Sequence, residues 1–158
     1  MEIFKHLKGR IDARVEILFA GSGPNLEELT ELLKGQSQFK SLGFRNDVRQ
    51  LMSECDFVML FSKHEGLPIS LIEADMCGAP VICNDVGGNA EIVRNGENGF
   101  IVNEWNSLVD VLNSLPSMDK EMYRRMSQAG RKIFDKNFTF ETFKQNYLRL
   151  IDNVENST

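Results

Sequence analysis

The run DFVMLFSKHEGLPISLIEADMCGAPVIC, residues 56–83, contains the pattern that decides the fold. Residues 56–61 are almost wholly apolar, which predicts a short buried strand. Apolar residues at helical spacing follow from about Ile69 to Cys77, and Gly78 is placed to end that helix in the left-handed conformation. The apolar residues 80–83 predict a second strand. Strand, helix and strand in this order predict a parallel βαβ unit.

The same alternation continues on both sides of this unit. Further strands are expected at 15–20, 41–43 and 99–102, and further helices at 24–35, 48–55, 105–115, 122–134 and 140–154. The spacing of Ile3, Phe4 and Leu7 predicts one more helix at the start. The expected fold class is therefore α/β, a Rossmann-like open parallel sheet with flanking helices. Residues 1–158 are expected to form a single domain with a C-terminal helix at about 140–154.

Composition excludes several classes of protein. The chain has 158 residues, with 18 basic and 23 acidic side chains and a net charge of −5, which argues against binding nucleic acid through bulk positive charge. No apolar run approaches the ~20 residues that cross a bilayer, and the first residues show no apolar segment of a secretion signal. Three cysteines without a Cys-x-x-Cys spacing favour a reduced, cytoplasmic chain.

Two loops at expected strand ends could carry chemistry. In open α/β sheets, ligands bind beyond the carboxyl ends of the strands. Gly21 and Gly23 would let a phosphate or ribose approach the backbone, although Leu26 replaces the third glycine of a dinucleotide fingerprint. After the strand at 56–61, the N–H groups at the start of the next helix suit a pyrophosphate, and a carboxylate one turn in, Glu73, can accept both hydroxyls of a ribose. Taken singly, Glu65 is more simply a solvated loop acid, and Glu73 is more simply a partner of the helix dipole. The Gly21–Pro24 segment is as readily a tight turn from strand to helix.

Five segments in order resemble a known family. EGLPISLIEA at 65–74, followed by CGAPVI at 77–82, resembles the signature of group 1 glycosyltransferases, family four of the retaining GT-B enzymes. The two glutamates eight positions apart are its core. The further matches are FAGSGP at 19–24, LGF at 42–44, VGGNAEIV at 86–93 and NGENGFIV at 95–102. The resemblance covers about residues 12–150 and implies the C-terminal, donor-binding half of a GT-B fold.

The resemblance implies a role for each matching residue. Glu65 would act at the catalytic site on the hydroxyls of the donor sugar, and Glu73 would bind the ribose. The backbone contacts to sugar and diphosphate would come from Gly66, Leu67, Pro68, Ile69 and Ser70. Phe44 and Arg45 would lie against the base, with Gly21 and Gly23 lining the nucleotide cleft. The implied reaction moves a hexose from a UDP- or GDP-sugar to a glycan or lipid-linked acceptor with retention. The resemblance also implies that no cofactor and no metal is needed, because most such enzymes hold the diphosphate with basic side chains and helix N-termini. The sequence agrees with this expectation, since His6 and His64 form no ligand cluster.

The sequence departs from the family pattern at its start. The acceptor-binding N-terminal domain is expected to be absent. The first strand of the donor domain is also expected to be absent, together with the Arg and Lys of the loop that follows it. Lys8-Gly9 resembles the family's Lys-Gly, but no apolar strand precedes it, so the role in binding phosphate is not assigned to Lys8. Either the strands at 15–20 and 56–61 close the resulting gap, or another chain fills it. The fragment alone is expected to be inactive. The alternatives are a non-catalytic Rossmann-like binding module, or another GT-B enzyme such as a nucleotide-sugar epimerase. Peripheral membrane association of the full-length enzyme is a further expectation.

Overall fold

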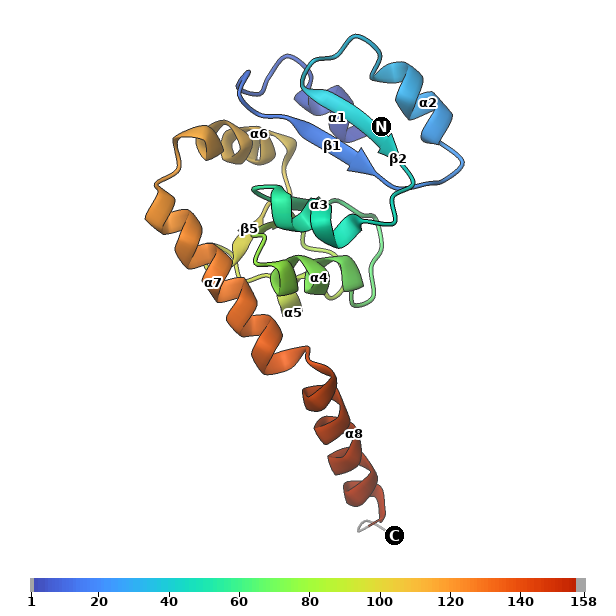
Figure 1. The fold of residues 1–158 in the computed structure, drawn as a ribbon, viewed down its shortest axis with the longest axis vertical. Helices are drawn as coiled ribbons and strands as arrows, with labels where there is room; N and C mark the ends of the chain where they lie inside the picture. The colour runs from blue at the N-terminus through green and yellow to red at the C-terminus, as the bar shows by residue number, and fades with distance from the viewer. Residues whose placement is uncertain (1, 156–158) are drawn as a thin grey trace.

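The structure is a computed structural model that describes residues 2–155. It alternates strands and helices along the chain (Figure 1). The elements, in order, are α1 Glu2–Leu7, β1 Ile17–Ala20, α2 Leu26–Leu32, β2 Phe39–Gly43, α3 Val48–Glu54, β3 Val58–Leu60, α4 Ile69–Cys77, β4 Val81–Cys83, α5 Asn89–Ile92, β5 Gly99–Ile101, α6 Trp105–Ser114, a 3₁₀ turn Leu115–Ser117, α7 Lys120–Asn137 and α8 Phe140–Glu155. Each predicted strand and helix is present, with ends shifted by a few residues. α5 and the 3₁₀ turn were not predicted.

All strand pairs are parallel, as expected, and the flanking helices confirm the α/β class. The strands form two separate sheets. β1 pairs with β2, with Ile17 opposite Phe39, and β3, β4 and β5 form the second sheet in that order. Among residues 2–155, no strand joins β1 to β3. Of the two alternatives for the gap, closure by the strands at 15–20 and 56–61 is therefore wrong: these strands do not pair.

Helix α4 has the limits that the sequence predicts. α4 begins after Pro68 and ends at Gly78, which has φ +73° and is in the left-handed conformation. The N–H of Gly78 donates to Asp75 O at 3.0 Å, and that of Ala79 donates to Ala74 O at 2.9 Å. These bonds satisfy carbonyls that a helix end otherwise leaves free, and they return the chain into β4.

Two apolar clusters hold the sheets and helices together. One packs α1 and α6 against the strands through buried side chains that include Phe4, Leu7 and Leu108. The other packs α4 against β4 and includes Leu71 and Val81, both fully buried. All three residues of β4 are completely buried, as an interior strand of a parallel sheet requires.

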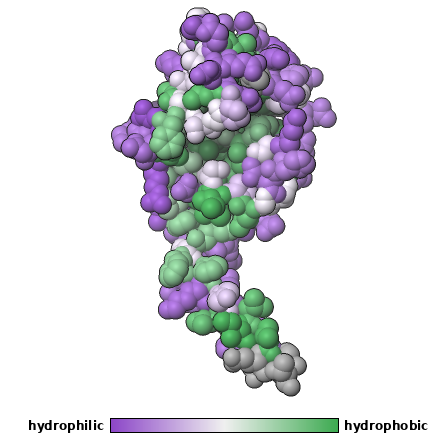
Figure 2. All heavy atoms as spheres, turned by 90° about the vertical axis from the view of Figure 1, so that its right-hand side faces the viewer, coloured by the Kyte–Doolittle hydropathy of each residue, from purple (hydrophilic) through white to green (hydrophobic). Residues whose placement is uncertain are grey.

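The last two helices differ in how they contact the rest of the protein. α7 packs along α4, whereas α8 extends away from the body of the protein (Figure 1). α8 has no buried residue within 140–154, and its apolar side chains, among them Phe140, Phe143 and Tyr147, are exposed. Figure 2 shows apolar side chains gathered over this helix. Within the described residues, no helix is both long enough and apolar enough to cross a membrane.

Candidate functional site

Glu65 lies in the loop between β3 and α4, where neighbouring side chains fix it. Its half-buried carboxylate accepts a hydrogen bond from Ser62 Oγ at 2.5 Å. The backbone of Ser62 is in turn held by Asn84, which follows β4. The N–H of Ser62 donates to Asn84 Oδ1 at 3.2 Å, and Asn84 Nδ2 donates to Ser62 O at 2.7 Å. The loop that carries Glu65 is therefore tied to the carboxyl end of the neighbouring strand.

Two glycines hold the same loop from the other side. The N–H of Gly88 donates to Gly66 O at 2.7 Å. A Cβ added at Gly88 would stand 2.5 Å from Gly66 O, and one at Gly87 would stand 2.0 Å from Glu65 O. Only glycine permits this approach of two backbones. Both glycines belong to the family-like segment at 86–93, but no part in the site was predicted for them.

The first turn of α4 offers its backbone donors beside this loop. Pro68 is buried and precedes the helix, while Leu67 and Ile69 are exposed. Pro68 O accepts from the N–H of Leu71 at 3.1 Å, so the first turn is formed. The N–H groups at its start and the positive end of the helix dipole favour an anion at this position. Ser70 is half-buried and lines the large cavity between the sheets.

Glu73 lies one turn into α4, half-buried and facing α3. Its Oε1 is 3.9 Å from Arg49 Nε, and the Arg49 side chain is mostly exposed. An ion pair of this length between partly exposed groups contributes little free energy. The Glu73 carboxylate therefore keeps the capacity to accept hydrogen bonds from a ligand.

The turns after β1 and β2 form the second part of the site. The N–H of Gly21 donates to Gly43 O at 2.8 Å, which joins the two turns at their strand ends. Gly43 has φ +63°, a conformation that favours glycine. Phe44, the next residue, is 74% exposed, so its ring is free to stack on a ligand. Gly23 is exposed in the loop that leads into α2.

Arg45 has a partner that the sequence analysis did not predict. Its Nε lies 2.7 Å from Asp47 Oδ1, and its Nη2 pairs with the other carboxylate oxygen. The Arg45 guanidinium holds the pKa of the Asp47 carboxyl below its usual value. Asp47 therefore holds the Arg45 side chain in place beside Phe44. The carboxylate of Asp47 also neutralises the positive charge of Arg45.

The structure thus brings the predicted residues together in two groups. The turns at 21–23 and 43–45 form one, and the segment 65–73 forms the other. α3 follows the first group directly and contacts α4 of the second through the Arg49–Glu73 pair. The histidines lie apart: His6 stacks on Trp105, and His64 is in the exposed loop. Within residues 2–155, no three His, Cys, Asp or Glu side chains gather as they would around a metal ion.

The site thus lies at the carboxyl ends of parallel strands, where α/β proteins bind their ligands. It combines glycine turns, an open helix N-terminus and two carboxylates. The model of the family described as glycosyl transferases group 1 matches residues 1–133, and the chain belongs to this family.

Two curated proteins resemble the chain at moderate identity. The chain is 27% identical over 152 residues to N-acetyl-alpha-D-glucosaminyl L-malate synthase of Bacillus anthracis, covering 93% of this chain and 39% of that protein. It is 31% identical over 134 residues to the putative glycosyltransferase EpsD of Bacillus subtilis, covering 80% of this chain and 34% of that protein. The chain therefore spans less than half the length of these relatives.

Solved structures agree on the fold. Anabaena Alr3699/HepE in complex with UDP superposes with a TM-score of 0.84 at 26% identity, over 97% of this chain and 45% of that one. TarM of S. aureus superposes with a TM-score of 0.82 over 94% of this chain and 31% of that one, and at 17% identity it shows the fold alone. These neighbours are GT-B glycosyltransferases, which confirms the expected fold class.

Proposed function

We propose that this chain is the donor-binding part of a retaining glycosyltransferase of family four, which moves a hexose from a nucleotide sugar to a glycan or lipid-linked acceptor. The observation that carries the proposal is the segment 65–73. Here a fixed carboxylate, an open helix N-terminus and a second carboxylate follow one another within nine residues. This order matches the sugar, the diphosphate and the ribose of a nucleotide sugar.

Each part would act on the donor through ordinary chemistry. The N–H groups at the start of α4 would stabilise the negative charge that develops on the departing diphosphate. Glu65, oriented by Ser62, would accept hydrogen bonds from hydroxyls of the donor sugar. Glu73 would accept those of the ribose, and the exposed ring of Phe44 would stack on the base. Neither a metal nor a cofactor is part of this proposal.

UDP is the nucleotide that the comparisons favour. HepE has been solved with UDP and with UDP-glucose, and the chain is 26% identical to it. An undecaprenol-linked acceptor is suggested by a relative from Campylobacter jejuni, N,N'-diacetylbacillosaminyl-diphospho-undecaprenol alpha-1,3-N-acetylgalactosaminyltransferase, which is 29% identical over 117 residues. The whole enzyme would then work in the cytoplasm, at the membrane surface that presents such an acceptor.

Transfer itself is proposed to require residues outside this chain. Holding donor and acceptor in near-attack geometry can supply ~7–11 kcal/mol of the barrier, and the described residues offer only the donor side. Cations for the diphosphate are also few, since Arg45 is engaged by Asp47 and only the exposed Lys63 follows β3.

The test compares residues 1–158 with a longer protein that adds an acceptor-binding domain. Ligand-observed NMR with UDP, GDP, ADP and their sugars measures binding, and product analysis measures transfer. The proposal expects weak, UDP-selective binding by the short chain and donor-dependent product only from the longer one. Absence of nucleotide selectivity in both would indicate a non-catalytic binding module and overturn the proposal.

A further inference from the structure

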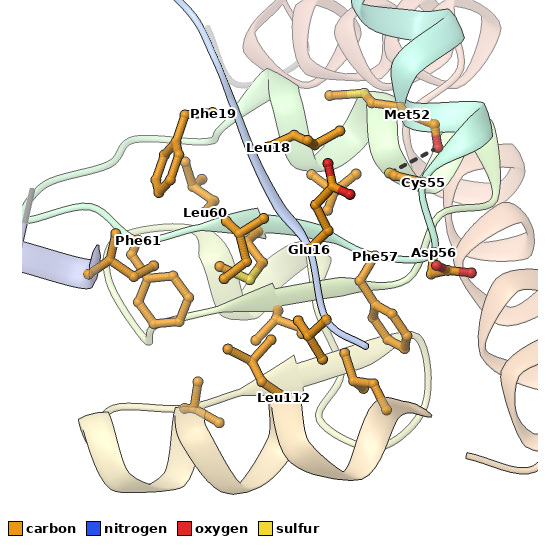
Figure 3. A pocket seen from close by; sticks show the side chains of 18 of the residues that line it. Glu16, Leu18, Phe19, Met52, Cys55, Asp56, Phe57, Leu60, Phe61 and Leu112 are labelled. Carbon is orange, nitrogen blue, oxygen red and sulfur yellow. Dashed lines mark hydrogen bonds between the residues drawn. The ribbon is translucent and has the colours of Figure 1, made fainter. Parts of the chain in front are cut away.

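A small cavity with a charged lining lies between α7 and the turn that leads into β5. The large cavity between the two sheets, of about 1970 Å³, differs in character, because its lining includes the apolar side chains of Leu18, Leu60 and Leu112 (Figure 3). The small cavity, here the basic cavity, has a volume of about 250 Å³. Four basic side chains contribute to its lining: Arg94, Arg125, Lys132 and Lys136.

The basic side chains of α7 differ in whether a carboxylate neutralises them. The helix carries six basic and two acidic side chains, although the whole chain has a net charge of −5. Glu121 pairs with Arg124, with 3.5 Å between Oε2 and Nη1. Asp135 pairs with Arg131, with 3.1 Å between Oδ1 and Nε. Neither arginine lines the basic cavity, so both carboxylates of the helix act elsewhere.

The cations at the basic cavity are therefore left with excess charge. Within residues 2–155, no acidic side chain pairs with the three basic side chains that α7 contributes to the lining. Glu97 lines the cavity too, but it pairs with Arg94, with 3.3 Å between Oε1 and Nη1. Lys136, in the last turn of α7, also offsets the helix dipole. Arg125 lies about three turns earlier, where the dipole does not explain it.

The backbone that faces α7 across the basic cavity is fixed by hydrogen bonds. The N–H of Arg94 donates to Oδ1 of the fully buried Asn98 at 2.7 Å, and the N–H of Glu97 donates to Arg94 O at 2.9 Å. On the side of α7, the lining includes Ile133, which is buried in the core. The frame of the cavity is thus formed without a ligand, so little ordering of the backbone opposes binding.

The basic cavity is separate from the predicted donor site. Residues 94–97 lead into β5 and therefore lie at the amino end of that strand. The predicted donor residues follow β1, β2 and β3 at their carboxyl ends. Because β3, β4 and β5 run parallel in one sheet, the two sites lie at opposite edges of it. The cations of the basic cavity do not serve the diphosphate of a donor.

The excess charge and the small volume define the ligand. A phosphate group carries about −1.5 to −2 charges at pH 7 and offers three strong acceptor oxygens. Arginine binds it with two parallel hydrogen bonds, and lysine binds it as a point charge. The volume is below the roughly 300–1,000 Å³ of sites for drug-sized ligands, so a whole nucleotide is too large.

We propose that the basic cavity binds a phosphate monoester or diphosphate group through Arg125, Lys132 and Lys136. Free phosphorylated compounds and lipid headgroups both present this group, and the cavity recognises the chemistry that they share. The inference is independent of the proposed function, because it involves neither the donor nucleotide nor transfer.

The test titrates inorganic pyrophosphate into residues 1–158 at constant ionic strength and follows the N–H groups of the backbone and of the arginine side chains by NMR. We expect saturable shifts confined to residues 94–98 and 125–137, with a Kd of about 1 mM or less, because several hydrogen bonds to a charged ligand form together. Shifts at residues 66–71 report pyrophosphate at the start of α4, so binding at the predicted donor site is read separately.

Two double variants make the result specific. Arg125→Gln with Lys132→Gln should weaken the binding of pyrophosphate by about tenfold or more. Lys120→Gln with Arg124→Gln removes the same charge from the same helix, at side chains that do not line the basic cavity, and should change the Kd by less than about twofold. All four side chains are exposed, so the fold tolerates both pairs of substitutions.

Vesicles of phosphatidic acid in phosphatidylcholine distinguish the two sources of phosphate. Sedimentation of the protein with these vesicles, reversed by pyrophosphate, would assign a lipid headgroup to the cavity. Binding of pyrophosphate without sedimentation would assign a free phosphorylated compound. Absence of saturable shifts in residues 94–98 and 125–137 at millimolar pyrophosphate, or equal weakening by the two double variants, would overturn the proposal.

Discussion

The carboxylate of Asp75 on α4 lies against Gly130 on α7, so closely that a Cβ on Gly130 would stand 2.4 Å from Asp75 Oδ1. Asp75 is fully buried, and its oxygens accept from Asn98 Nδ2 at 3.0 and 3.1 Å. Burial raises the pKa of the Asp75 carboxyl to about 6, and the hydrogen bond from Asn98 opposes this rise only in part. The helix pair beneath the site therefore contains a carboxyl group that titrates near neutral pH.

The raised pKa of Asp75 predicts that stability falls as pH rises. The folded state holds this proton more tightly than the unfolded state, where the pKa is about 3.9. The stabilisation from this proton is complete below about pH 4 and is lost as pH rises through about 6. The free energy of unfolding should therefore fall by roughly 3 kcal/mol over this range. Urea unfolding of the native chain and of Asp75→Asn between pH 4 and 8 measures the difference.

Asn is the matched substitution, because it keeps an oxygen that can accept from Asn98 Nδ2. The surface carboxyls Asp12 and Asp47, whose pKa values are lowered by arginine, titrate alike in both proteins and cancel in the difference. If the free energy of unfolding changes with pH in the same way in both proteins, the pKa of Asp75 is not raised and the prediction is wrong.

The contact between Gly88 and the loop that carries Glu65 predicts a second effect. Gly88→Ala should destabilise the fold by about 1–3 kcal/mol, because its Cβ would stand 2.5 Å from Gly66 O and the loop must move. Gly88 has φ −84°, so the effect is steric and not conformational. Gly66→Ala, which meets nothing within 4 Å, is the control and should change stability by less than about 1 kcal/mol. Chemical denaturation measures both, and equal effects would contradict the contact.

Glu65 and Glu73 should separate in function. In a longer protein that turns over, Glu65→Gln should lower the rate of transfer while leaving inhibition by the free nucleoside diphosphate nearly unchanged, because Glu65 is assigned to the sugar alone. Steady-state kinetics with the diphosphate as competitor checks this. A parallel loss of inhibition would mean that Glu65, through its bond to Ser62, organises the loop instead.

The sequence predicted those features that depend on neighbours along the chain. The limits of α4 and its Gly78 end follow from local spacing and backbone conformation, and both are confirmed. α5 is a single turn and too short to show a helical period. The Arg45–Asp47 pair and the clamp of Gly88 on Gly66 depend on which side chains and backbones meet after folding. The division into two sheets likewise depends on which strands pair after folding, and strands that are distant in sequence can be neighbours.

The roles of the predicted site residues remain predictions, and Glu73 offers the sharpest test. The measurement is the affinity of residues 1–158 for UDP and for 2′-deoxy-UDP, by ligand-observed NMR at millimolar concentrations, for the native chain and for Glu73→Ala. We predict that the native chain prefers UDP, that Glu73→Ala loses about 1.5–3 kcal/mol of binding free energy, the range for hydrogen bonds to a charged group, and that the variant no longer distinguishes the two nucleotides. Equal affinity of the native chain for both nucleotides would contradict the assignment of Glu73 to the ribose and, with it, the proposed donor site.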